Sequence, residues 1–399
     1  MVFGGTMIRT MISFIIITSL FLLFSFFGCN SENPIITTSE DTLVFANAMI
    51  IDGTGSEAIE HATLIVICDK IHMVSNSTDI SLPDGARVFD LEGKTILPGF
   101  INAHVHGSYN QNQLKNWVRG GVTTVRDLSP LGEANFIEKR NGYNQNPFNA
   151  RLVSSTPIIT CSGGYGGSFV DTPESAEIRV LDYINSGVDI IKFSIEDNCQ
   201  GRWNVISQEI ANIIVSTAHS NNLRASVHIT HDYNIEMALI AGVDDIAHMV
   251  TEPMTDELVQ QIVEANIYWT PTLELWKGVS EYYSIDLDQV AIRNLRKFFN
   301  AGGNVALGTD FAGFHTSFDS GLPFTEIQSM KEAGMSNMDI IVAATLNAAY
   351  VCGMENEIGT IEVGKIADLL IINGNPLTDI DVLRNVSMVI HNGHIVREE

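Results

Sequence analysis

The sequence predicts an α/β protein, a TIM-like (β/α)8 barrel with a small β-sandwich domain built from both termini. Through the middle of the 399-residue chain, strand-like runs alternate with helix-length segments. Eight such units over roughly 250 residues have the size and rhythm of a (β/α)8 barrel. Segments that look all-β flank this region on both sides. A doubly wound sheet is the alternative arrangement.

The N-terminus has the pattern of a secretory signal. Arg9 precedes an apolar run over residues 11–27, which ends in Gly28-Cys29. A positive residue, an apolar core and a small residue before the cut site are typical of such signals. The ending resembles a bacterial lipoprotein signal, in which the cysteine becomes the lipidated first residue. We therefore expect residues 1–29 to be a signal peptide and a lipid on Cys29 to anchor the protein to a membrane of the bacterial cell envelope. An uncleaved anchor helix is the alternative, because the run approaches the ~20 residues that span a bilayer.

The composition excludes several classes of function. The chain has 47 acidic and 22 basic residues, a formal net charge of −25. Because phosphate binding needs clustered Lys and Arg, we expect no nucleic-acid partner. None of the five cysteines forms a Cys-x-x-Cys pair, so neither a zinc knuckle nor a redox dithiol is indicated. The pairing of the other four stays open: Cys68, Cys161, Cys199 and Cys352.

Short strand-like runs mark the two flanking segments. After a polar linker over residues 30–40, they alternate with turn signals such as Asp52-Gly53 and Asp84-Gly85. Similar runs return near the C-terminus, at residues 368–373 and 386–396. We predict that residues 41–94 and 353–399 form the two parts of the sandwich and that residues 95–352 form the barrel.

The first barrel strand is predicted over residues 95–103, with a break at Pro98-Gly99. It leads directly into His104 and His106. Residues i and i+2 of a strand point to the same face, so two imidazoles lie together at this strand end. Because histidine is the commonest metal ligand, this pair is interpreted as half of a metal site.

Seven further strands and several helices complete the predicted barrel. The strands are residues 123–127, 151–154, 189–193, 224–228, 245–248, 267–270 and 304–308. The helix candidates are residues 173–186, 207–221, 255–266 and 288–301. Several candidate helices end at Gly or Asn, as helix C-termini do.

Polar side chains with metal-binding chemistry recur where the predicted strands end. Catalytic residues of such barrels lie at the C-terminal ends of the strands. Singly, each has a structural alternative as a core histidine, a snorkelling lysine or a helix N-cap. A lysine in a buried strand, however, costs free energy unless it is paired, neutral or modified. The joint pattern therefore predicts one site at the barrel mouth: Lys192, His228, His248 and Asp310, together with His104 and His106.

In these residues the chain resembles the metal-dependent amidohydrolase superfamily, over nearly all of residues 41 to 399. The combination with Lys192 is similar to the branch that contains prolidase-like dipeptidases and imidazolonepropionase-related proteins. The motifs that carry the resemblance are residues 97–106, 123–127, 269–273 and 359–370.

The resemblance implies a binuclear site that holds two divalent metal ions, with zinc as the expected metal. One metal would bind His104, His106 and Asp310, and the other His228 and His248, with Lys192 between them as a carbamate formed with carbon dioxide. Neutral imidazoles suit Zn²⁺, and a carbamate offers the anionic bridge that a plain lysine lacks. Two such metals activate a water, and Asp310 would serve as its general base.

Departures from the dipeptidase pattern bear on the substrate. Dipeptidase relatives often carry His in the loop that is 162–167 here, and Tyr at the position of Thr230. Because those family positions bind the substrate carboxylate, the resemblance does not extend to dipeptide specificity. The candidates for the substrate pocket are Tyr165, His231 and Tyr233.

The predicted function is therefore hydrolysis of an amide or related C–N bond in a small molecule such as a dipeptide, an acyl-amino acid or a cyclic amide. A lactonase or phosphotriesterase-like hydrolase on the same scaffold is the alternative enzyme. A surface lipoprotein that only binds is the alternative outside enzymes. The base Asp310 argues against it, because a binding scaffold needs no general base.

Overall fold

The computed structural model describes residues 42–76, 85–130, 132–197, 201–314 and 316–399. The predicted signal peptide, its Cys29 and the linker lie outside the described residues, as does Cys199. Cys161 and Cys352 are free thiols. No helix of the described part of the chain is both long enough and apolar enough to cross a bilayer.

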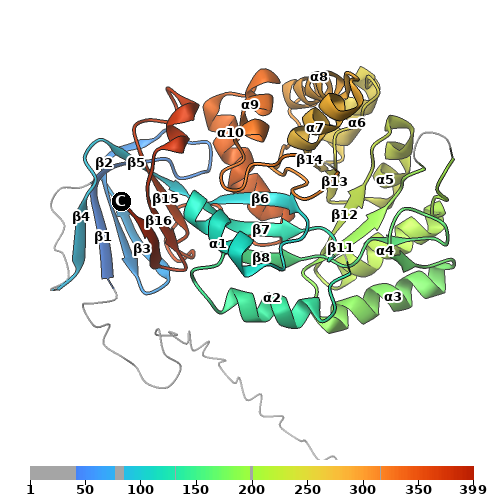
Figure 1. Cartoon of the computed structure of the whole chain (residues 1–399), viewed down its shortest axis with the longest axis horizontal. Helices are drawn as coiled ribbons and strands as arrows, with labels where there is room; N and C mark the ends of the chain where they lie inside the picture. Colours follow the sequence, from blue (N-terminus) through green and yellow to red (C-terminus); the bar gives the residue numbers. More distant parts are fainter. Residues whose placement is uncertain (1–41, 77–84, 131, 198–200, 315) are drawn as a thin grey trace, which may run out of the picture. The chain divides into compact units, whose positions relative to one another are not determined.

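Strands from both ends of the chain form one eight-stranded sheet, the blue and red strands of Figure 1. Its order is β17-β16-β15-β5-β1-β2-β3, with β4 beside β1. Apolar side chains from both ends, among them Phe45, Leu64 and Leu369, form one buried cluster. The strands are β1 (Thr42–Ile50), β2 (Ile59–Ile67), β3 (Lys70–Ser75), β4 (Arg87–Asp90), β5 (Lys94–Pro98), β15 (Leu369–Asn373), β16 (Val386–His391) and β17 (His394–Glu398).

The interrupted strand predicted over residues 95–103 is in fact two strands in different sheets. β5 belongs to the eight-stranded sheet, whereas β6 (Phe100–Val105) belongs to a parallel sheet. Gly99 is the switch, because its amide donates to the Asp368 carbonyl (2.8 Å). A Cβ at this position would lie 2.3 Å from Thr123 Oγ1, so the crossing requires glycine.

The middle of the chain forms two parallel sheets whose strands alternate with helices. One has the order β6-β7-β8 and the other β10-β9-β11-β12-β13-β14. The strands are β7 (Val122–Asp127), β8 (Arg151–Ser154), β9 (Ile159–Thr160), β10 (Ser168–Phe169), β11 (Ile190–Ser194), β12 (Arg224–His228), β13 (Asp245–Ala247) and β14 (Tyr268–Thr270). The α/β class is as predicted, whereas β9 and β10 were not predicted.

Isolated parallel bridges connect these sheets to each other and to residues 305 and 311. Ser155 pairs with Ile190, Trp269 with Val305, and Val105 with Phe311. Residues 304–308, predicted as the eighth strand, form such a bridge at Val305 instead of a regular strand. Their backbone nevertheless bonds to both neighbours: the Ala306 amide donates to Trp269 and the Leu307 carbonyl accepts from Ala103.

The four predicted helices are present to within about two residues, as α3, α4, α6 and α8. Left-handed glycines, Gly187 (φ +92°) and Gly242 (φ +74°), end α3 and α5. The helices are α1 (Gln111–Gly120), α2 (Phe136–Asn144), α3 (Pro173–Ser186), α4 (Gln208–Ser220), α5 (Ile235–Ala241), α6 (Asp256–Glu264), α7 (Leu273–Tyr283), α8 (Leu287–Asn300), α9 (Phe324–Glu332), α10 (Asn337–Ala344) and α11 (Leu346–Val351).

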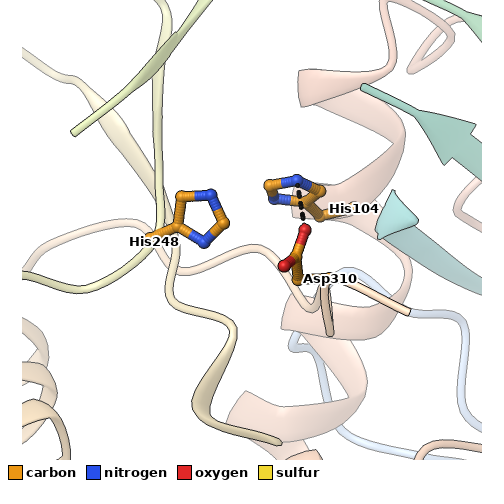
Figure 2. Close-up of side chains that lie close together, drawn as sticks. All are labelled: His104, His248 and Asp310. Atoms are coloured by element: carbon orange, nitrogen blue, oxygen red, sulfur yellow. Dashed lines mark ion pairs between the residues drawn. The ribbon is translucent and has the colours of Figure 1, made fainter. Parts of the chain in front are cut away.

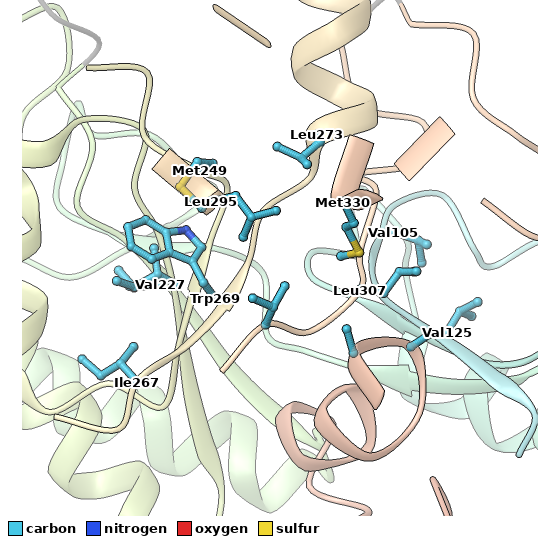
Figure 3. Close-up of a cluster of buried hydrophobic side chains, with 14 of the residues drawn as sticks. Val105, Val125, Val227, Met249, Ile267, Trp269, Leu273, Leu295, Leu307 and Met330 are labelled. Carbon is cyan, nitrogen blue, oxygen red and sulfur yellow. The ribbon is translucent and has the colours of Figure 1, made fainter. Parts of the chain in front are cut away.

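Alternation along the central strands separates apolar from chemically active residues. Ile191, Phe193 and Val227 belong to the large buried cluster between strands and helices, part of which Figure 3 shows around Trp269. Since neighbouring residues of a strand face opposite sides, Lys192 and His228 point away from that layer. The helix-facing core thus orients both polar side chains toward the inner face of the strands.

Candidate metal centre

The candidate ligands come from strand ends that lie side by side. His104 is in β6 and His106 follows it, while Lys192 lies in β11 and His228 ends β12. In the parallel ladder His228 pairs with Ser194 of β11 and with Ala247 of β13. Because the strands are parallel, their carboxyl ends meet at one edge and bring these residues together.

Two ligands reach the site through an unusual backbone conformation. β13 ends at Ala247, and His248 has a left-handed backbone (φ +73°) instead of continuing the predicted strand. Asp310 is also left-handed (φ +63°). Such conformations cost free energy in non-glycine residues and cluster at functional sites. Gly308 allows the chain to pass close by, because a Cβ there would lie 2.9 Å from the His104 Cβ.

The ring nitrogens and the carboxylate converge. His104 Nε2 and His106 Nε2 lie 3.1 and 3.0 Å from the same oxygen, Asp310 Oδ1. His104, His248 and Asp310 each offer a ligand atom, all within 4.8 Å of one another (Figure 2). The His228 and His248 rings are adjacent, with centroids 4.5 Å apart. The structure thus brings together five of the six predicted ligands by measured contacts.

Burial and the ion pairs with Asp310 together determine the protonation of this cluster. Burial lowers the pKa of His104 to about 3 and holds the pKa values of His228 and His248 well below their usual range. Burial would also lower the pKa of His106, but the Asp310 carboxylate outweighs it and raises that pKa. Burial would raise the pKa of Asp310, yet the two imidazoles beside it hold it well below its usual range. Three neutral imidazoles and an ionised carboxylate result.

Lys192, the sixth predicted ligand, is 1% exposed. Burial lowers the pKa of its amine from 10.5 to about 7. Its Nζ is among the buried atoms that have no hydrogen-bond partner among the described residues. The backbone around it is well tied, since the Thr156 hydroxyl bonds to both the amide and the carbonyl of Lys192 (2.9 and 3.0 Å). A fixed backbone therefore holds a buried amine that has a lowered pKa and no hydrogen-bond partner among the described residues.

These residues fit a divalent metal. In addition to Lys192 Nζ, buried atoms without a hydrogen-bond partner among the described residues include both ring nitrogens of His104, His106 Nδ1 and Asp310 Oδ1. Buried polar atoms normally make hydrogen bonds, so a group of nitrogen and oxygen atoms without them needs an explanation. Neutral imidazole and carboxylate are the donors that Zn²⁺ takes. The orientation of the His248 ring is also fixed by a second contact, because its Nδ1 lies within hydrogen-bond distance (3.0 Å) of Thr272 Oγ1.

A cavity of ≈ 790 Å³ opens over these ligands. Its polar lining includes His106, His228, His248 and Asp310, which places the cluster in its wall. The remaining lining residues are Ile158, Tyr165, Glu196, Arg202, Trp203, Thr230, Leu275, Trp276, Val279, Tyr283, Ala312, Gly313 and Phe314.

Of the three predicted pocket residues, Tyr165 lines this cavity, and its ring lies 4.4 Å from the His228 ring. His231 and Tyr233 are outside the lining. His231 is buried with its Nδ1 2.6 Å from Glu252 Oε1, and the exposed Tyr233 donates its hydroxyl to Asp197 Oδ1 (2.6 Å). Other protein groups thus engage both side chains.

The sequence did not identify the other cavity-lining residues. Glu196, two residues beyond β11, is 2% exposed and accepts from the amide (3.0 Å) and hydroxyl (2.5 Å) of Thr230. Its place just after the strand that carries Lys192 was the one available signal. Trp203 and Phe314 come from loops, where no periodicity marks them, whereas Trp276 and Tyr283 lie on α7, a helix that was not among the predicted ones.

Comparison with known proteins adds relatives over most of the chain. Residues 95–396 match the profile of the Amidohydrolase family. Ochratoxinase of Aspergillus niger is 23% identical, over 90% of this chain and 88% of the relative. Imidazolonepropionase of Geobacillus kaustophilus is 23% identical, over 80% of this chain and 84% of the relative. The solved structure of a Xaa-Pro dipeptidase has a TM-score of 0.79 at 24% identity, over 90% and 100% of the two chains, and so shares the fold.

Proposed function

The chain belongs to the amidohydrolase family, as its strand-end motifs predicted, and we propose that it is a metal-dependent hydrolase of an amide or related C–N bond in a small molecule. The observation that carries this proposal is the buried group of nitrogen and oxygen atoms that have no hydrogen-bond partner among the described residues, in the wall of a substrate-sized cavity. The family relatives ochratoxinase and imidazolonepropionase support hydrolysis of C–N bonds as the reaction class.

We propose that the site holds two divalent metals. His104, His106 and Asp310 would hold one, and His228 and His248 the other. Lys192 as a carbamate would bridge them. The convergence of His104, His106 and Asp310 within about 3.1 Å supports the first group, and the adjacent His228 and His248 rings support the second. For Lys192, the support is an amine that is buried, has no hydrogen-bond partner among the described residues and has its pKa lowered to about 7. A large share of it is therefore uncharged at neutral pH, and carbon dioxide reacts with the uncharged amine.

Bound metals would lower the pKa of a water molecule and polarise the carbonyl of the scissile bond. Asp310 stays ionised, so it can accept the proton of the attacking water and deliver it to the leaving nitrogen. The neutral His228 and His248 each keep one ring nitrogen without a proton, which is the form of histidine that binds a metal. The Thr272 hydroxyl keeps the His248 ring in place while the substrate binds.

We further propose that β6 to β8, β11 to β14 and residues 304–308 close into one eight-stranded barrel, with β9 and β10 outside it, and that the eight-stranded terminal sheet forms the sandwich domain. The isolated bridges Ser155–Ile190, Trp269–Val305 and Val105–Phe311 support closure, because they connect β8 to β11 and, through residues 304–311, β14 to β6. The related solved structure supports the same fold. For its location, we propose an envelope lipoprotein anchored through Cys29, on the N-terminal sequence pattern alone.

Metal analysis combined with hydrolysis assays tests the proposed function. Elemental analysis of the metal-loaded protein is expected to show about two metal ions per chain. A panel of dipeptides, acyl-amino acids, cyclic amides and lactones identifies the bond class that is cleaved. His228→Ala should lose metal and activity, whereas the matched control His72→Ala, an exposed histidine of β3, should keep both. A protein that binds no transition metal after loading would rule the proposal out, and turnover of lactones alone would favour the lactonase.

A further inference from the structure

Aromatic side chains gather on two sides of the cavity above the metal centre. Four segments of the chain supply them: the loop after β9, the loop after β11, α7, and the loop beyond Phe311. The residues are Tyr165, Trp203, Trp276, Tyr283 and Phe314. Their convergence is not explained by the hydrolytic chemistry, which uses histidine, lysine and aspartate.

The first aromatic wall is built on α7. Trp276, Val279 and Tyr283 have the i, i+3, i+7 spacing of one helix face, and all three line the cavity. Phe314 stacks on Tyr283, with ring centroids 5.5 Å apart and planes at 28°. The loop approaches α7 at Gly278, where a Cβ would lie 2.2 Å from Thr316 Oγ1. Close packing thus holds the two rings together as one apolar surface.

This wall remains accessible. Tyr283 is 55% exposed and Phe314 37% exposed, although both are large apolar side chains. Large apolar groups that border a cavity and stay in water mark binding surfaces. At the inner end of the wall, the Trp276 ring lies 6.4 Å from the ring of His248. The apolar surface therefore extends from the metal centre to the mouth of the cavity.

The second wall mirrors this arrangement. Tyr165 and Trp203 have ring centroids 4.8 Å apart, and the Tyr165 ring is 4.4 Å from His228. Each wall thus begins beside one of the two neighbouring histidines, His228 and His248. A group attached directly to the bond being cleaved would meet aromatic rings on either side.

We propose that this cavity selects substrates that carry a flat aromatic group, such as a phenyl ring, next to the scissile bond. The proposal rests on the proposed hydrolase function and names its substrate class. Aromatic rings prefer offset-stacked or edge-to-face contacts with other rings, and such a contact adds about 0.5–1.5 kcal/mol beyond its burial, or about two- to twelvefold in affinity. Burial of the ring itself adds to this preference.

Matched substrate pairs test the selection. The pairs differ only by phenyl in place of methyl or hydrogen on one side of the amide: N-benzoylglycine against N-acetylglycine, N-acetylphenylalanine against N-acetylalanine, and glycylphenylalanine against glycylalanine. At least one pair is expected to show kcat/KM about tenfold or more in favour of the phenyl member. Equal or alkyl-preferring kinetics in all three pairs, with turnover present, would overturn the selection and leave the hydrolase function standing.

Variants assign the preference to the walls. Phe314→Ala and Tyr283→Ala should each reduce the phenyl-to-methyl ratio of kcat/KM about threefold to tenfold. Phe148→Ala is the matched control, because Phe148 is also about half exposed (50%) and does not line the cavity. It should keep the wild-type ratio. If both wall variants keep that ratio as well, the aromatic wall does not select the substrate.

An equilibrium measurement separates this inference from the proposed function. Calorimetric titration of the purified full chain with N-benzylacetamide and with N-methylacetamide requires no turnover. If no amide is hydrolysed but the benzyl compound binds about tenfold more tightly, and Phe314→Ala removes the difference, the hydrolase function fails and the aromatic cavity stands. If amides are hydrolysed and the two compounds bind equally, the aromatic selection fails and the hydrolase function stands.

Discussion

Replacing Lys192 with Met tests the least ordinary part of the site. Methionine has a similar volume without the amine, so the substitution removes a buried group that has no hydrogen-bond partner among the described residues. The metal-free variant should therefore fold at least as well as the metal-free wild type. An unsatisfied buried polar group costs about 1–3 kcal/mol, and this is the smallest gain expected in the free energy of unfolding at neutral pH, because the lowered pKa of the amine adds to it.

The pH dependence of stability gives a sharper measurement. The pKa of Lys192 falls from 10.5 in the unfolded chain to about 7 in the fold. Between these two values the unfolded chain binds more protons than the folded protein, so stability rises with pH. Between pH 7 and 9.5 the lysine alone should add about 3 kcal/mol to the free energy of unfolding of the metal-free wild type. Lys192→Met should lack this part of the rise.

Urea unfolding of chelator-treated protein at pH 7, 8 and 9.5, with elemental analysis of the metal-loaded forms, measures both effects. Saturating metal should stabilise the wild type by about 4 kcal/mol at a thousand times its dissociation constant, and the Met variant much less. Lys331→Met, on an exposed position of α9, is the control that should change neither quantity. A Met variant that retains two metals per chain, or that shows the same pH dependence as the wild type, would refute the bridging role of Lys192.

Three further predictions concern other parts of the chain. Asp310→Asn should lower turnover at least ~10²-fold, because the side-chain amide cannot accept the proton. Metal content measured alongside shows whether the variant has lost only the general base or has also lost a metal ligand. Near wild-type turnover would contradict the mechanism. Cys29→Ser should release the protein from membranes, as fractionation and N-terminal analysis would show, whereas a wild type that is soluble or starts elsewhere would contradict the lipid anchor. Burial raises the pKa of Glu326 to about 8, so its contribution to stability is full below about pH 4.5 and is lost as pH rises to about 8. In urea unfolding, the change in the free energy of unfolding caused by Glu326→Gln should therefore be more stabilising at pH 8 than at pH 5 by a few kcal/mol. Equal effects at both pH values would contradict this.

Much of the local structure follows from the sequence because its signals are local. The helix over residues 173–186 is predicted by its Pro at the start and Gly187 after its end, and α3 has these bounds. The strand positions of Lys192 and His228 follow from period-two alternation, which depends only on neighbouring residues. The parallel-strand rule then places both at one edge, as the ladder between β11 and β12 shows.

The tertiary structure alone determines how distant segments meet. Gly99 separates β5 from β6 because the C-terminal segment bonds to its amide through Asp368, a partner 269 positions further along the chain. His248 turns into the site through a left-handed backbone that strand periodicity does not predict. Arg126 and Asp245, which belong to separate predicted strands, form a fully buried pair with Nη2 and Oδ2 2.8 Å apart.

The sequence by itself therefore determined which residue types lie at the strand ends, and with them the family and the candidate ligands. The tertiary structure decided which side chains line the cavity and how each ligand is protonated. The physical reason is that strand and helix periodicities arise from the chain's own neighbours, whereas the low pKa of Lys192 and the stacking of Tyr283 on Phe314 arise from burial and contacts between segments that only folding brings together.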